Sequence, residues 1–226
     1  MTTTARAIAD SVQNILDYLI EADLALYTTA VAVSPGRVTF TRYQPDAAFL
    51  IDREHPGIDQ YMAWVTSGSY SAVLLDGALL QFTYTLEGGE VTGHRLAYIP
   101  CPFAVDPDLL ASGEPLADII DIYRDGDALL RSPIRFDFDP EASKAGHPAA
   151  HMTLNGVDCR IAAVAPVHAL RFADFVFRNF YAELWVAHQP FFSAATARHL
   201  GPAVITDVER QELHVAWDTH SKLLSA

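Results

Sequence analysis

Cysteine and long apolar runs are both scarce in this chain of 226 residues. Its two cysteines, Cys101 and Cys159, cannot form a disulfide framework in a chain of this length, so we expect both thiols to be reduced. No apolar run reaches the ~18–20 residues that a membrane span needs, and no signal-peptide pattern opens the chain. These absences predict a cytoplasmic protein with no membrane partner.

Basic charge is also scarce, because 15 lysines and arginines stand against 28 acidic residues. The resulting formal charge of −13 opposes approach to a phosphate backbone, and no basic run supplies a local patch that would overcome it. We therefore expect no nucleic-acid partner. The simplest interpretation of the acidic charge is that it keeps the protein soluble.

Nucleotide-binding fingerprints, internal repeats and linkers are absent from the sequence as well. Neither a GxGxxG pattern nor a P-loop is present, and we assign no cofactor. The chain does have a hydrophobic fraction of 50%, which is enough to form a core without stabilisation by disulfides or metal ions. Helical patterns at both ends enclose a block of strands. This order predicts the α+β class, an antiparallel β-meander sheet with packed N-terminal and C-terminal helices, in a single domain of residues 1–226.

The first half of the chain divides into one helix and several strands. Apolar residues at helical spacing predict a helix from Thr4 to about Asp23. The stretch GRVTFTR alternates Val38 and Phe40 with threonines, which is typical of a half-buried strand. Residues 70–99 contain an Asp-Gly turn and a Glu-Gly-Gly-Glu turn between β-rich runs. Since these turns supply the positive φ angles of tight hairpins, the segment is interpreted as a meander of three antiparallel strands.

The second half begins with strands. Arg131–Asp139 is predicted to be a strand that Pro140 ends, and His151–Leu154 and Asp158–Val164 flank Asn155-Gly156, a strong hairpin signal. Two helices are predicted to follow.

The first of these helices, from about His168 to His188, is apolar around most of its circumference, so we expect Phe175, Phe180 and Trp185 to be buried. Its polar stripe consists of Arg171, Asp174 and Arg178. The capping-box pattern at Thr206–Glu209 then predicts a last helix. Its expected buried stripe is Leu213, Ala216, Trp217, His220 and Leu223.

The strand around residue 135 presents a charged face. Side chains alternate along a strand, so Phe136 and Phe138 point to the core while Arg135, Asp137 and Asp139 point together to the other side. These charges have two interpretations. They form a solvated surface ion pair worth ~0–1 kcal/mol, or they hold a ligand.

Two histidines in HPAAH extend this charged face. The motif lacks the glutamate of an HExxH zinc helix, and Pro148 removes His147 from helical geometry, which favours a loop histidine followed by His151 at the start of a strand. Arg160 lies across the hairpin turn from this strand. We therefore predict that Arg135, Asp137, Asp139, His147, His151 and Arg160 form one ligand-binding patch or groove. Metal binding through the histidines and one aspartate is a weaker hypothesis, and no metal is assigned.

Three functions are compatible with this patch. The leading hypothesis is a binding or accessory protein that holds a small anionic ligand or a loop of a protein partner, because Arg suits phosphate and carboxylate groups. The second is a phosphoester hydrolase, metal-independent or metal-assisted, with His147 or His151 as acid-base group and Arg135 and Arg160 as phosphate clamps. The third is a purely structural subunit of a complex. Cys159 is better explained as a buried strand cysteine than as a nucleophile.

An ordered series of segments carries a resemblance to a known family. RFDFDP, HPAAHMTLN, CRIAAVAP and RFADFVFRNFY follow one another, after LLDGALLQFTYTL and HRLAYIPCPF. Over roughly residues 70–185 the chain resembles a bacterial family known only as domain of unknown function 2290. The resemblance marks Asp76, Gly77, Gln81, His94, Arg95, Pro100, Arg135, Asp137, Asp139, His147, Pro148, His151, Cys159 and Arg160.

The sequence departs from this family pattern at the corner after the CRI segment. Ala162 and His168-Ala169 stand where the family usually has prolines, which puts the strand-to-helix corner in doubt and leaves the patch unaffected. The resemblance supplies no settled activity. It implies a bacterial cytosolic protein that serves as an accessory factor in a multi-gene system.

Overall fold

Helix α1 (Thr3–Glu21) forms where apolar residues recur at helical spacing, as expected. The computed structural model describes residues 3–42, 57–154, 159–194 and 200–217. Within α1 the apolar stripe is buried against the sheet, with Ile15, Leu16 and Leu19 each at most 1% exposed. Burial of that stripe, more than intrinsic helix propensity, stabilises the helix.

One ten-stranded sheet runs through the described chain, and its strands follow the order β1-β4-β5-β6-β7-β8-β9-β10, with the β2–β3 hairpin joined to β5 through β3. All pairs are antiparallel except β9 with β10. The α+β prediction is therefore confirmed. The strands are β1 (Ala25–Thr28), β2 (Val31–Ser34), β3 (Arg37–Phe40), β4 (Ala72–Leu74), β5 (Leu79–Glu87), β6 (Glu90–Ile99), β7 (Ile134–Phe138), β8 (Ala150–Leu154), β9 (Arg160–Ala163) and β10 (His214–Val215).

The predicted meander is strands β4, β5 and β6. Gly77 has a φ of +82° in the β4–β5 turn, where its N–H donates to the carbonyl of Leu74, so the turn needs the glycine that the Asp-Gly signal indicated. Strand β7 follows β6 in the sheet, and β8 and β9 form the expected antiparallel pair. The Asn155-Gly156 turn itself lies outside the described residues.

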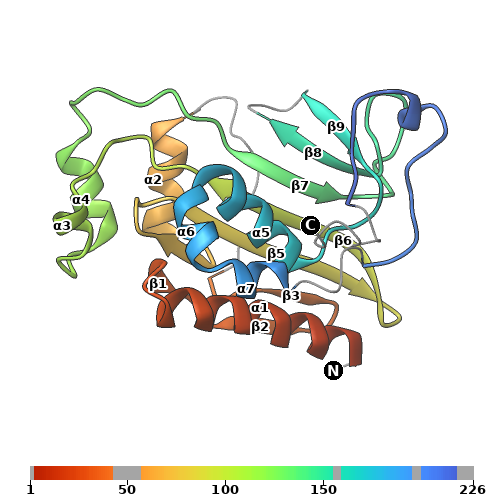
Figure 1. The fold of residues 1–226 in the computed structure, drawn as a ribbon, viewed down its shortest axis with the longest axis horizontal. Helices are drawn as coiled ribbons and strands as arrows, with labels where there is room; N and C mark the ends of the chain where they lie inside the picture. Colours follow the sequence, from red (N-terminus) through yellow and green to blue (C-terminus); the bar gives the residue numbers. More distant parts are fainter. Residues whose placement is uncertain (1–2, 43–56, 155–158, 195–199, 218–226) are drawn as a thin grey trace.

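Helices cover the two sides of the sheet differently. In Figure 1, α5, α6 and α7 lie in front of β5 and β6 with α1 beside them, whereas α3 and α4 lie at the left end of the molecule. The first group packs on Leu96 and Phe136, and α2 and α4 pack on Ala97 and Ile99 on the opposite side. The helices are α2 (Ile58–Ser67), α3 (Pro107–Leu110), α4 (Leu116–Ile122), α5 (Ala169–Phe180), α6 (Ala182–Ala187) and α7 (Gln189–Ser193).

The long helix predicted for residues 168–188 is two helices. Tyr181 has φ −135° and ψ 53°, which ends α5 and lets the chain turn into α6. The burial expectation for Phe180 is wrong, because this side chain at the end of α5 is 43% exposed and stacks on Tyr98. Asp174, expected on a polar stripe, is 2% exposed. Phe175 and Trp185 are half-buried.

Over residues 206–217, which the structure describes, the predicted last helix is also wrong. The capping box forms, since Thr206 and Glu209 exchange hydrogen bonds between backbone N–H and side-chain oxygen at 2.8 and 3.2 Å. Only one 3₁₀ turn follows (Glu209–Gln211), and the chain then enters β10, where the Val215 carbonyl accepts from Val164 N–H at 2.9 Å. Leu213 is 78% exposed. Residues 214–215 form backbone hydrogen bonds with the edge of β9, and they would lose these bonds if this segment were helical.

The remaining residues of that predicted helix stripe have different fates. Trp217 is half-buried against Phe136, whereas Ala216 is exposed. His220 and Leu223 lie outside the described residues. The single-domain assignment of residues 1–226 stays a prediction.

Candidate functional site

Polar side chains occupy one side of the sheet from β3 to β9, opposite the side that α1 and α5 cover. Strand register places them in rows: Thr83 pairs with Arg95, Arg95 with Asp137, and Asp137 with His151. Opposed residues of paired strands share a face, so each row is continuous. We call this set the polar belt: Arg37, Thr39, Gln81, Thr83, Thr85, Arg95, Arg135, Asp137, His151, Thr153 and Arg160.

Asp137 is the buried centre of the belt, with a side chain only 5% exposed. Arg95 Nε donates to its Oδ1 at 2.6 Å, and Arg135 Nε lies 3.3 Å from its Oδ2. Burial would raise the pKa of this carboxyl, but the two guanidinium groups outweigh it and hold the pKa below its usual value. Asp137 therefore stays ionised at neutral pH and fixes both arginines. This is not the solvated ion pair that was the simpler interpretation of the strand.

His151 lies beside Asp137 and is 2% exposed. Its Nδ1–H donates to the Pro148 carbonyl at 2.8 Å, so in the neutral ring Nε2 carries a lone pair toward Asp137 Oδ2, 3.7 Å away. Two acceptors cannot hydrogen-bond, which explains the gap. Burial lowers the pKa of His151 although Asp137 opposes that shift. The ring is therefore neutral at pH 7 and shielded from solvent.

The other predicted patch residues surround this centre. His147 is half-buried and contacts the His151 ring at a centroid distance of 4.8 Å, and Arg160 is half-buried on the belt opposite Thr153. Asp139 is exposed just beyond β7, where its Oδ1 accepts from Ala142 N–H at 3.1 Å. Cys159, expected to be a buried strand cysteine, is exposed instead, because β9 begins only at Arg160.

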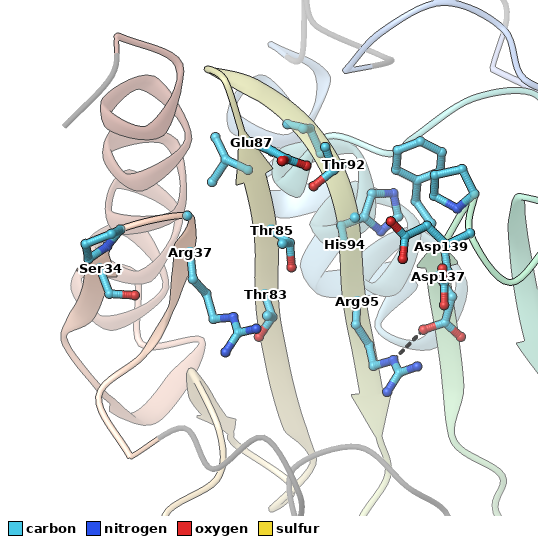
Figure 2. Close-up of a pocket in the computed structure, with 18 residues that line it drawn as sticks. Ser34, Arg37, Thr83, Thr85, Glu87, Thr92, His94, Arg95, Asp137 and Asp139 are labelled. Atoms are coloured by element: carbon cyan, nitrogen blue, oxygen red, sulfur yellow. Dashed lines mark hydrogen bonds and ion pairs between the residues drawn. The ribbon is translucent and has the colours of Figure 1, made fainter.

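A groove of about 860 Å³ opens over part of the belt. Arg37 from β3 and Arg95 from β6 face it from opposite sides, and Thr83 and Thr85 of β5 lie between them (Figure 2). Gly93 adds no side chain, and a Cβ there would lie 3.3 Å from the Phe138 carbonyl oxygen. The guanidinium heads and threonine hydroxyls can together hold an oxyanion.

The groove overlaps only part of the patch that the sequence predicts. Asp137 and Asp139 line it, whereas Arg135, Arg160 and the two histidines are not among its lining residues. Arg37, Thr83 and Thr85 were not predicted. The alternation in GRVTFTR did put Arg37 opposite the apolar residues of its strand, but only the pairing of β3 with β5 shows which face that is.

His94, marked by the family resemblance, also lines the groove, but the hydrogen bonds of its ring connect backbone groups of β7 and of the segment before α5. Its Nε2 accepts from Val167 N–H at 2.8 Å, so its Nδ1 donates to the Phe136 carbonyl at 3.2 Å. Burial lowers the pKa of His94 to about 4. The neutral ring fastens β6 to the segment that leads into α5, which is a structural role.

Asp76, also marked by the resemblance, organises one end of the sheet. Its Oδ1 accepts from the Tyr181 hydroxyl at 2.9 Å, and Arg131 lies 3.8 Å from its Oδ2. Burial, followed by the charge of Asp76, raises the pKa of Tyr181, so this phenol stays protonated and donates. Asp76 thereby ties the β4–β5 turn to the corner between α5 and α6.

Neither a metal site nor a membrane-spanning helix is found among the residues that the structure describes. Their His, Cys, Asp and Glu side chains form no group of three or more that could hold a metal ion. In the same part of the chain, no helix combines the length and the apolar character needed to cross a membrane.

Comparison with known proteins identifies the family. Searches of curated proteins and of solved structures found no match. A family model described as "Uncharacterized conserved protein (DUF2290)" matches residues 24–217, which extends well beyond the stretch that resembled the family by its motifs. It covers the whole polar belt and every strand of the sheet. The chain therefore belongs to the DUF2290 family of uncharacterized conserved proteins.

Proposed function

We propose that this protein binds a small anionic ligand in the groove over the polar belt and acts as a binding or accessory protein. The observation that carries the proposal is the approach of Arg37 and Arg95 to one groove from separate strands, across the hydroxyls of Thr83 and Thr85. Guanidinium groups offer planar, bidentate donors that match phosphate and carboxylate oxygens. A carboxylate on a loop of a protein partner presents the same chemistry.

The buried carboxylate of Asp137 prepares the groove for this task. By holding Arg95 at 2.6 Å, it fixes one guanidinium before any ligand arrives. Ordering a long side chain in advance removes ~0.5–1.5 kcal/mol of entropy cost from binding. The groove is thus arranged for recognition without a large rearrangement.

We also propose a bacterial, cytoplasmic setting within a multi-gene system. The family resemblance supports the bacterial part, and the two free thiols, Cys101 and Cys159, support a reducing compartment. The net charge of −13 supports a small ligand over a nucleic acid.

Phosphoester hydrolysis is the alternative use of the same surface. The observation that favours it is the orientation of His151, whose Nδ1–H is anchored on Pro148 and whose Nε2 faces Asp137. A general base must reach its substrate, and a 2% exposed His151 outside the groove lining does not. We therefore place hydrolysis second.

Ethyl phosphate tests both functions, since it is a small anion and a phosphoester. Its dissociation constant is measured by ¹H–¹⁵N chemical-shift titration, and release of inorganic phosphate is followed in the same samples. Arg37→Lys and Arg95→Lys should each weaken binding about tenfold, because lysine keeps the charge but loses the bidentate fork. Arg6→Lys, on the exposed face of α1, is the matched control and should bind like the parent.

Two results would overturn the order of these proposals. Unchanged affinity in both groove variants, or no binding by the parent, removes the anion site. Phosphate release by the parent that His151→Asn abolishes would put the hydrolase first.

A further inference from the structure

The groove has two regions of opposite charge. Figure 2 shows the guanidinium groups of Arg37 and Arg95 at one end, beside Thr83, and Glu87 and Asp139 farther along the groove. Glu141 also lines it. These three carboxylates come from the end of β5 and from the segment after β7, and all are exposed at the groove's rim.

Asp137 does not belong to the acidic rim, although it lines the groove. Its charge is balanced inside the protein by Arg95 at 2.6 Å and Arg135 at 3.3 Å. The rim carboxylates are different. Asp139 accepts a backbone N–H from Ala142, a neutral donor that leaves its negative charge in place. Among the described residues that line the groove, Arg37 and Arg95 outnumber Asp137 at the arginine end, whereas the rim carries the carboxylates of Glu87, Asp139 and Glu141.

A purely anionic ligand fits only the arginine end. Asp139 follows β7 directly, its N–H donates to the Ala149 carbonyl at 2.8 Å, and its side chain lines the same groove as Asp137. Since side chains on one face of an extended strand repeat every ~6.5–7 Å, Asp139 lies about one such step from Asp137. At that distance a second anionic group on the same ligand would meet carboxylate repulsion with little intervening protein. A positive group in that place would be attracted instead.

We infer that the natural ligand is zwitterionic: a small molecule with a phosphate or carboxylate for Arg37 and Arg95 and an ammonium group for the rim of Glu87, Asp139 and Glu141. This inference rests on the proposed anion site and adds the second half of the ligand. Amino acids and phosphorylated amines belong to this class. Nucleic acids and polyphosphates do not, since their negative charges would continue along the rim.

Phosphoethanolamine and ethyl phosphate form the decisive pair of probes, because they differ by the ammonium group. Both carry a dianionic phosphate at about pH 8, well above the second phosphate pKa. Titration of the parent should show about fivefold tighter binding of phosphoethanolamine. The triple variant Glu87→Gln, Asp139→Asn, Glu141→Gln should lose this preference and bind ethyl phosphate at least as tightly as the parent does.

The matched control is Asp10→Asn, Asp17→Asn, Glu21→Gln, which removes the same charge from exposed positions on α1. It should keep the preference. Equal affinity for the two probes in the parent, or a preference that survives in the rim variant, overturns the zwitterion inference and leaves the anion site standing. Failure of both probes to bind the parent overturns the anion site itself.

Discussion

Two buried carboxylates, one in the helical layer and one in the polar belt, are each surrounded by arginines in different ways. Asp174 accepts from Arg171 at 2.7 Å, Arg178 at 3.2 Å and Trp185 at 2.8 Å, all from its own helix or the next. Asp137 takes Arg95 from a neighbouring strand far away in the sequence. The first cluster is local and the second is assembled by the sheet.

Under the proposed function, this difference separates a cluster that stabilises the fold from one that prepares a binding groove. The cluster around Asp174 holds the corner between α5 and α6, with Arg178 also lying 4.3 Å over the Trp185 ring. Its donors satisfy the carboxylate within that corner. The cluster around Asp137 instead places Arg95 in a groove wall. Arginines around a buried acid therefore indicate a binding site only when one of them also reaches a cavity.

Replacing each aspartate is the strongest test of this comparison. Asp174→Asn should lower the free energy of unfolding by ~3–5 kcal/mol, because it leaves the half-buried Arg171 and the base of the exposed Arg178 without the buried anion that they pair with. Urea denaturation gives the stability. Affinity for ethyl phosphate, measured on the fraction that stays folded, should not change.

Asp137→Asn is the partner variant. It should also lose stability, but it should weaken ethyl phosphate binding as well, since Arg95 is no longer fixed. If Asp174→Asn weakens binding to the same extent, the two clusters are not functionally distinct.

The next largest effect is expected from acidification, which should lower the free energy of unfolding through His94. The folded-state pKa of His94 is about 4, below the ordinary ~6.5, so its stabilising effect is complete above pH 6.5 and is lost as the pH falls toward 4. The expected loss from His94 is about 3 kcal/mol. Burial lowers the pKa of His151 and His168 too, so they add to the same trend.

The measurement is urea denaturation across this pH range. A His94→Gln variant should start less stable and show a shallower dependence on pH. A parent whose stability is flat from pH 6.5 to 4 contradicts the role assigned to His94.

The smallest loss of stability is expected for Phe180, at the end of α5. Phe180→Ala should cost about 1 kcal/mol, because the ring is 43% exposed and its main contact is the stack on Tyr98 at 4.7 Å. Phe172→Ala in the same helix is the control and should cost ~3–5 kcal/mol, since Phe172 is 0% exposed. Similar losses for the two, measured by thermal unfolding, would show that the corner packs more tightly than described.

Local signals predicted the parts of the fold that local chemistry determines. The Asp-Gly turn requires a positive φ, and the glycine supplies it, so the meander could be found in the sequence. The alternation of Arg135 and Asp137 with phenylalanines placed both charges on one face of β7 correctly. The burial of Asp137 was not predictable from this alternation, because it depends on Arg95 from another strand as well as on Arg135.

Tertiary context determined the parts that failed. The capping box at Thr206 promotes a helix, but pairing of residues 214–215 with β9 prevails. The spacing of Asp174 with Arg171 and Arg178 predicted an exposed polar stripe. The bend at Tyr181 instead brings Trp185 over Asp174, which buries the carboxylate. Arg37 was missed because no pattern within β3 indicates that the strand joins β5. Each failure involves a partner distant in sequence or a bend that the periodicity does not show.

The parallel pairing of β10 with β9 also has a consequence for biosynthesis. When β9 leaves the ribosome, the segment that will cover its outer edge has not yet been made. That edge then presents unpaired N–H and C=O groups, the template on which strands of separate chains associate. Strand β10 covers this edge only after residues 214–215 have been made, so chains that stall between β9 and β10 should aggregate more readily than chains that include β10.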